Sequence, residues 1–189
     1  VGEAGDILAP MLAAAASNLR LGRGTEPGIE MGPVVSDDAI ARIRGYVERA
    51  RAAGVRILLD AGAGAEGGSF AAPVIFDSVD PASELARDEI FGPVLAIVRA
   101  PSLDGAIAIA NRSRYGNASS IFTRDGGNAR TFASRIEVGM VGINVGVAAP
   151  MAFFPFGGVK DSIFGDLRCH GKDAIAFYTQ QRVVVSRWP

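Results

Sequence analysis

Hydrophobic residues recur along this chain at the spacing typical of amphipathic helices. Near the start, one apolar face predicts a core-facing helix and comprises Leu8, Met11, Leu12, Ala15 and Leu19. A second helix is predicted from Ser36, a favourable N-cap followed by two acids, to Gly54, a favourable stop. Its apolar stripe comprises Ile40, Ile43, Val47 and Ala50.

Short apolar runs between helical segments predict strands. The predicted strands are 55–60, 71–79, 92–100, 118–125, 140–146 and 182–188. Further helices are predicted over 102–113, with Ser102 as its cap, over 127–139, closing at Gly139, and over 172–180. Strands that alternate with helices predict an α/β fold with a largely parallel sheet and flanking helices.

Charge and cysteine content narrow the class of protein. Lys and Arg number 19 against 20 Asp and Glu, a net charge of −1, which gives no electrostatic reason to expect nucleic acid or an anionic membrane as a partner. No apolar run reaches the roughly 18 residues that a membrane span needs. The single cysteine, Cys169, excludes an internal disulfide and fits a reducing compartment. A cytoplasmic protein is expected.

Two short motifs resemble functional sites, but the residues around them do not fit those functions. The run GAGAEG at 62–67 matches a dinucleotide-binding fingerprint, yet a turn and strand follow where a helix is needed, which favours an exposed Gly-rich loop. Cys169 lies beside His170, but sequence neighbours point in different directions, so an incidental thiol is the better interpretation. One His and one Cys cannot form a four-ligand zinc site. The residues alone identify no nucleophile, base or metal site.

Longer motifs carry a family resemblance. DEIFGPVLAIV at 88–98 resembles a hallmark of the aldehyde dehydrogenase superfamily, and MGPVVSDDAIARI at 31–43 resembles the segment before it. YGNASSIFTRD, IEVGMVGINVG and FFPFGGVKDSIFGD resemble the segments that follow, in the same order. The tail HGKDAIAFYTQQRVVVSRW resembles methylmalonate-semialdehyde dehydrogenases, the branch that acylates coenzyme A.

The resemblance implies the catalytic domain of the aldehyde dehydrogenase fold. Residues 1–160 would be the C-terminal part of that domain, and 161–189 a tail whose last strand, at 182–188, mediates oligomerisation. The nucleophilic cysteine and the NAD-binding domain of such enzymes would precede Val1, so no catalytic residue is expected in this chain. A homodimer or homotetramer is expected.

The resemblance also implies roles for particular residues. Glu89 would accept hydrogen bonds from the ribose next to nicotinamide, and Phe91 would flank the same ribose; taken alone, they read as a solvated acid and a core ring. Phe154 and Phe156 would line the aldehyde tunnel or pack in the core. Asn144 is expected to hold a loop through its side chain. Lys160 could face an anion, but an exposed lysine is the better interpretation.

The implied reaction is NAD-dependent oxidation of an aldehyde. In the acylating branch, methylmalonate or malonate semialdehyde yields propionyl-CoA or acetyl-CoA, with coenzyme A as co-substrate. Two alternatives stay open at this point: an ordinary, non-acylating NAD(P)-dependent aldehyde dehydrogenase, and a non-catalytic interaction module on the same scaffold.

Overall fold

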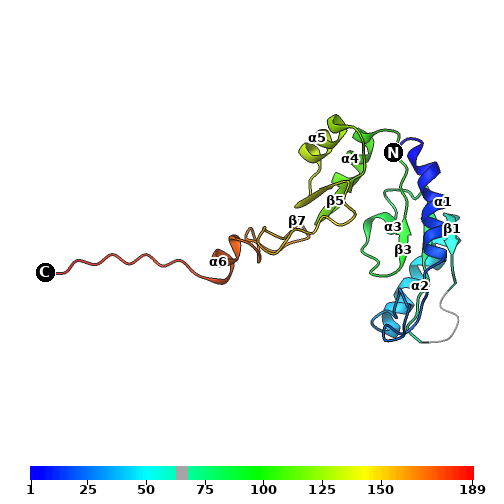
Figure 1. The fold of residues 1–189 in the computed structure, drawn as a ribbon, viewed down its shortest axis with the longest axis horizontal. Helices are drawn as coiled ribbons and strands as arrows, with labels where there is room; N and C mark the ends of the chain where they lie inside the picture. The colour runs from blue at the N-terminus through cyan, green and yellow to red at the C-terminus, as the bar shows by residue number, and fades with distance from the viewer. Residues whose placement is uncertain (63–67) are drawn as a thin grey trace. The chain divides into compact units, whose positions relative to one another are not determined.

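A computed structural model describes residues 1–62 and 68–189 of the chain (Figure 1). The Gly-rich run at 62–67 therefore lies, beyond Gly62, outside the described residues. The chain divides into two compact units, Val1–Ala106 and Ile107–Pro189, and each is described by itself.

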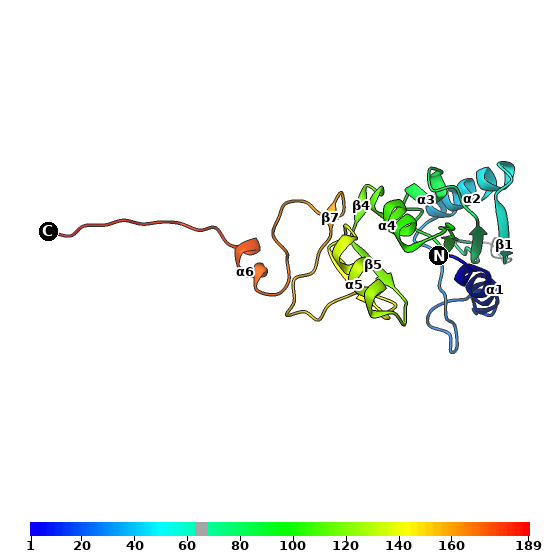
Figure 2. The same ribbon diagram turned by 90° about the horizontal axis from the view of Figure 1, so that it is seen from above.

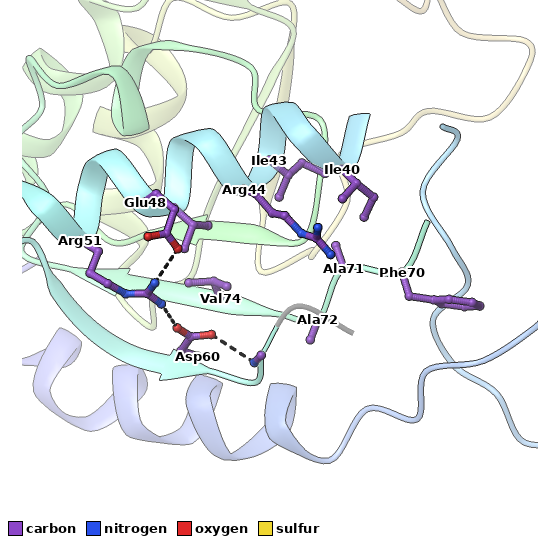
Figure 3. A pocket seen from close by; sticks show the side chains of 12 residues that line it. Ile40, Ile43, Arg44, Glu48, Arg51, Asp60, Phe70, Ala71, Ala72 and Val74 are labelled. Atoms are coloured by element: carbon purple, nitrogen blue, oxygen red, sulfur yellow. Dashed lines mark hydrogen bonds and ion pairs between the residues drawn. The ribbon is translucent and has the colours of Figure 1, made fainter. Parts of the chain in front are cut away.

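Unit 1 contains a three-stranded sheet between two helices. Its elements are α1 (Ala4–Ser17), α2 (Asp37–Ala52), β1 (Arg56–Asp60), β2 (Val74–Asp77), α3 (Glu84–Arg87) and β3 (Val94–Ala96). The strand order is β1-β2-β3, with β1 antiparallel and β3 parallel to β2. The helix α2 lies on one face of this sheet and α1 on the other (Figures 2 and 3).

The predicted second helix forms as expected. The Ser36 side chain accepts a hydrogen bond from the Ala39 backbone N–H at 3.2 Å, which confirms the N-cap. All four residues of its predicted apolar stripe are buried, and they pack against β2, where Phe76 is fully buried. Helical spacing thus placed the core face of α2 correctly, because burying that stripe removes its apolar surface from water.

The first helix is confirmed at Ala4–Ser17, but its predicted core face is only partly covered. Ala9 is its one fully buried residue, and the side chains of Leu8 and Met11 are exposed. Within the described residues, the predicted apolar face of α1 is therefore covered along only part of its width. Apolar surface is left open on this helix.

Unit 2 contains two small sheets. Its elements are α4 (Leu103–Asn111), which crosses the boundary between the units, and β4 (Tyr115–Gly116), β5 (Ala118–Ile121), α5 (Gly126–Arg135), β6 (Met140–Ile143), β7 (Val159–Lys160) and α6 (Asp173–Tyr178). Strands β5 and β6 pair in parallel and are joined by α5, whereas β4 and β7 pair antiparallel.

The helix α5 ends earlier than its sequence pattern predicts. Asp125 caps it by accepting a hydrogen bond from the Asn128 N–H at 2.8 Å. The helix stops at Arg135 rather than Gly139, because Ile136 takes an extended conformation and buries its side chain. The residues after it feed into β6.

The last residues, 179–189, form no strand with any described part of the chain and run extended (Figure 1). Their apolar side chains are exposed, with Trp188 85% exposed. The oligomerisation strand at 182–188 stays a prediction, since pairing with another subunit needs that subunit.

The α/β class predicted from the sequence is confirmed. Parallel pairing occurs in β2·β3 and β5·β6, and the antiparallel pairs β1·β2 and β4·β7 are additions that the hydrophobic pattern does not reveal. Within residues 1–62 and 68–189, every helix falls short of the length and apolar character that a membrane span requires.

Candidate functional site

The loop between α3 and β3 carries Glu89 and Phe91 on either side of a buried residue. Ile90 packs in the core of unit 1, and the side chains on both sides of it are exposed. Phe91 is 73% exposed, so in this chain it is not a core ring. Among the described residues, the Glu89 carboxylate has no hydrogen-bond or ion-pair partner. An unpaired acid and an open ring thus share one loop.

The backbone after Glu89 follows an unusual path. Phe91 has φ +54°, in the left-handed region that side chains rarely adopt. Gly92 follows so close to α2 that a Cβ at this position would clash with Cδ1 of Ile43. The Val94 N–H then bonds the Gly92 carbonyl at 2.8 Å, and the Val74 N–H bonds the Pro93 carbonyl at 2.9 Å. The turn therefore leads directly into the parallel pair β2·β3.

Three polar side chains of α2 bond this loop and the helix α3 before it. Arg49 makes a bidentate pair with Glu84, with N–O distances of 2.8 and 2.9 Å. The Tyr46 hydroxyl donates to Asp88 Oδ2 at 2.9 Å. Arg42 Nη2 donates to the Ile90 carbonyl at 3.1 Å. The apolar stripe predicts α2 as a core helix, and the spacing of Arg42, Tyr46 and Arg49 marks a second, polar face that this stripe does not reveal.

These bonds change the titration of the groups involved. The Asp88 carboxylate, as hydrogen-bond acceptor, raises the pKa of the Tyr46 hydroxyl above 10.0. The Arg49 guanidinium, hydrogen-bonded to Glu84, lowers the pKa of that carboxyl. Among the described residues, Glu89 makes no such contact, so both of its carboxylate oxygens are open to an outside donor, whereas one oxygen of Asp88 and both of Glu84 are already bonded.

Such an arrangement suits binding of a hydroxyl-bearing ring system. An ionised carboxylate accepts several hydrogen bonds and can take two hydroxyl donors at once. An exposed phenyl ring next to it offers a flat apolar surface. Glu89 and Phe91 together could therefore hold a sugar and the ring attached to it.

Phe154 and Phe156 lie in unit 2, on the segment between β6 and β7. Phe154 is 53% exposed, and its ring centroid lies 4.7 Å from that of Phe153. Phe156 is half-buried, with its ring centroid 5.6 Å from that of His170. Phe154 is therefore not a core residue of this chain, whereas Phe156 is partly packed.

The segment around Cys169 packs against the segment that carries these phenylalanines. A Cβ on Gly171 would lie 2.8 Å from the Phe154 carbonyl carbon, so the two backbones pass in close contact. The Cys169 thiol is half-buried and the His170 ring contacts Phe156. In the part of the chain that the structure describes, no cluster of three or more His, Cys, Asp or Glu could hold a metal ion.

Two further residues singled out by sequence have structural contacts. Asn144, at φ +56°, accepts a hydrogen bond from the Thr123 N–H at 2.8 Å and donates to the Thr123 carbonyl at 3.0 Å, which confirms its expected loop-holding role. The expectation of an exposed Lys160 is wrong. Its ammonium donates to the Asn111 carbonyl at 2.7 Å and pairs with Glu137 at 3.1 Å, because the end of α4 presents free carbonyls there.

A separate cavity of about 250 Å³ lies between α2 and the sheet of unit 1 (Figure 3). Ile40, Ile43 and Val47 contribute apolar lining from α2. At one end, Arg51 pairs with both Glu48 and Asp60. The cavity contains none of the residues expected to bind cofactor or substrate, and the two basic and two acidic side chains in its lining balance in charge.

Comparison with known proteins places these features in context. The model of a family described as "Aldehyde dehydrogenase family" matches residues 4–184. Malonate-semialdehyde dehydrogenase 2 of Geobacillus kaustophilus (strain HTA426) is 44% identical over 191 residues, which cover all of this chain and 40% of that protein.

Solved structures agree with the sequence relatives. The crystal structure of methylmalonate-semialdehyde dehydrogenase from Oceanimonas doudoroffii matches with TM-score 0.93 and 39% identity, over 100% of this chain and 40% of that one. A Mycobacterium tuberculosis aldehyde dehydrogenase complexed with NAD+ matches with TM-score 0.86 and 33% identity, over 96% of this chain and 38% of its own. The chain thus spans about 40% of the length of these relatives.

Proposed function

The chain belongs to the aldehyde dehydrogenase family, and from that premise we propose that it is the C-terminal portion of an NAD-dependent aldehyde dehydrogenase in which Glu89 and Phe91 hold the cofactor. The observation that carries this proposal is the exposed, unpartnered carboxylate of Glu89 beside the exposed ring of Phe91 on a braced loop. NAD-complexed relatives of the same fold support it.

The residues fit the cofactor chemically. The Glu89 carboxylate would accept hydrogen bonds from the two hydroxyls of the ribose next to nicotinamide, and Phe91 would pack against that ribose. When bound, NAD supplies the acceptor for the hydride that leaves the substrate. The part of Glu89 and Phe91 is to orient it and to exclude water on one side. The nucleophile would belong to the preceding part of the polypeptide.

We further propose that the substrate is malonate or methylmalonate semialdehyde and that coenzyme A receives the acyl group. The names of the relatives and the likeness of the tail to the acylating branch support this choice. Phe154 and Phe156 would then line the aldehyde tunnel, where apolar rings exclude water and protect a thioester from hydrolysis. An ordinary, non-acylating dehydrogenase is the alternative. NADH formation that does not depend on coenzyme A would favour that alternative.

The assembly follows from the same proposal. The whole enzyme would be cytoplasmic and would form a homodimer or homotetramer through residues 182–188, whose exposed valines suit strand pairing. Residues 1–160 would complete the catalytic domain and 161–189 the tail. Intact mass is the first measurement: a polypeptide much larger than 19.6 kDa is expected, and one of 19.6 kDa would favour a non-catalytic module instead.

The cofactor role is tested by Glu89→Gln in the full-length enzyme. Glutamine keeps the shape but removes the charge that strengthens the bonds to the ribose, so the KM for NAD should rise about tenfold. Glu26→Gln is the control, since Glu26 is also exposed and lies on another loop of the same unit. Unchanged NAD affinity and turnover in Glu89→Gln would refute the assignment.

A further inference from the structure

One face of α2 holds the loop that carries Glu89 and Phe91, and it does so with three hydrogen-bonding side chains and one apolar one. We propose that Tyr46, together with Arg42 and Arg49, acts as a positioning residue that fixes where Glu89 points. This inference rests on the proposed cofactor role of Glu89. The group Arg42, Ile43, Tyr46 and Arg49 is called the α2 brace below.

The brace follows from helical geometry. Positions 42, 46 and 49 are four and three residues apart, so their side chains leave α2 on the same side. Their partners follow in the reverse order along the chain: Arg42 donates to the Ile90 carbonyl, Tyr46 to Asp88, and Arg49 to Glu84 in α3. The helix and the loop thus run alongside each other in opposite directions and are bonded at three successive points.

An apolar contact closes the brace at its end. The Cδ1 atom of Ile43 lies where a Cβ at position 92 would be, so Gly92 and the Ile43 side chain are in close contact. Ile90 is buried in the core that α2 lines. The segment from α3 to β3 is therefore bonded at 84, 88 and 90 and packed at 90 and 92, whereas the side chains of Glu89 and Phe91 are exposed.

The free side chains depend on this support. The Glu89 carboxylate has no partner of its own among the described residues, so this side chain is held only through the backbone from which it leaves. Asp88 is held by Tyr46 on one side, and the carbonyl of Ile90 is held by Arg42 on the other. Phe91 needs the same support, because its left-handed conformation persists only where surrounding contacts enforce it.

Tyr46 has a second effect. Asp88 and Glu89 are adjacent acids, and either could compete for a hydroxyl donor. The Tyr46 hydroxyl already donates to Oδ2 of Asp88 at 2.9 Å, whereas both oxygens of Glu89 have no partner among the described residues. Tyr46 therefore makes Glu89 the more open of the two neighbouring carboxylates.

The test is Tyr46→Phe in the full-length enzyme, which removes one hydroxyl and keeps the ring. We expect the KM for NAD to rise about fivefold, with kcat changed less than twofold, because one hydrogen bond to a charged acceptor is lost. Arg51→Gln is the matched control: Arg51 lies on the same helix and is also ion-paired, but with Glu48 and Asp60 rather than with the loop.

A double-mutant cycle separates positioning from plain destabilisation. If Tyr46 acts through Glu89, adding Tyr46→Phe to Glu89→Gln should raise the KM for NAD no further. An equal rise in both backgrounds would overturn the positioning role, and so would a Tyr46→Phe KM equal to wild type while Glu89→Gln raises it. A silent Glu89→Gln would instead overturn the proposed function itself. Should Tyr46→Phe fail to fold, Asp88→Ala removes the acceptor of the same bond, and the same outcomes decide.

Discussion

Replacing Asp77 with Asn should destabilise unit 1 severely, because this carboxylate is the buried charge at the centre of its sheet. Asp77 is 1% exposed. Arg99 donates to it through Nε at 2.7 Å and Nη2 at 2.8 Å, and the Ser78 N–H adds a third bond at 2.7 Å. Arg99 also reaches Asp6 at 3.0 Å. One ion-pair network therefore ties β2, the segment after β3 and α1 together.

The magnitude follows from the burial of both partners. Removing one member of a buried ion pair costs about 3–5 kcal/mol, since the other charge is left uncompensated. Arg99 is 27% exposed and would keep Asp6, so we expect the lower end, about 3 kcal/mol. With a urea m-value of about 2 kcal/mol/M, the unfolding midpoint should fall by about 1.5 M.

The assay is urea unfolding of the chain followed by far-UV circular dichroism. Fluorescence would report poorly, since the single tryptophan, Trp188, is already exposed in the tail. Glu30→Gln is the control: Glu30 pairs with Arg20 at 3.7 Å on the surface of the same unit, and its loss should cost about 0.5 kcal/mol or less. An Asp77→Asn midpoint as close to wild type as that of the control would refute the reasoning.

The same pair predicts a pH dependence. Hydrogen bonds from Arg99 hold the pKa of Asp77 below its usual value. A carboxyl with a lowered folded pKa stabilises the protein above its unfolded pKa, about 3.9, and this stability is lost as the pH falls through the folded pKa. The difference between wild type and Asp77→Asn should therefore shrink below about pH 4. A difference that stays constant into strong acid would contradict the ion-pair account.

Two further changes test unit 2. Gly139→Ala places a Cβ against the Gly157 carbonyl and 2.7 Å from the Gly158 Cα. Because these are backbone atoms, which cannot move aside as a side chain can, the free energy of unfolding should drop by about 2 kcal/mol or more. Urea unfolding measures this drop. Asn144→Ala loses both bonds to Thr123 at a positive φ and should cost about 2 kcal/mol, whereas Asn144→Gly should cost less because glycine tolerates that φ. Equal costs for the two Asn144 variants would argue against backbone strain.

Local patterns predicted the elements and one helix face correctly. Ser36 and the apolar stripe of α2 could be read from a few neighbouring residues, because capping and amphipathicity are local properties. Residue patterns alone did not identify Glu89 as a site residue, since an exposed acid before an apolar strand is commonplace. Its nomination came from the resemblance of 88–98 to a family motif.

The limits of the sequence appear where distant segments meet. The sequence predicted a surface lysine at position 160. In the fold, the Lys160 ammonium instead bonds a carbonyl at the end of α4, 49 positions earlier in the chain. The bond between Tyr46 and Asp88 joins residues 42 positions apart, and that between Arg99 and Asp77 joins residues 22 apart. No periodicity within a helix or strand encodes such pairs.

By itself, the sequence determined the α/β class, the position of most helices and strands, and the family to which the chain belongs, because these depend on local spacing and on long ordered motifs. Only the tertiary structure decided which strands pair antiparallel, which side chains stay open and which are bonded. Those properties depend on packing between residues far apart in the chain. Glu89 is open and Asp88 is engaged because α2 presents Tyr46 to one of them and not to the other.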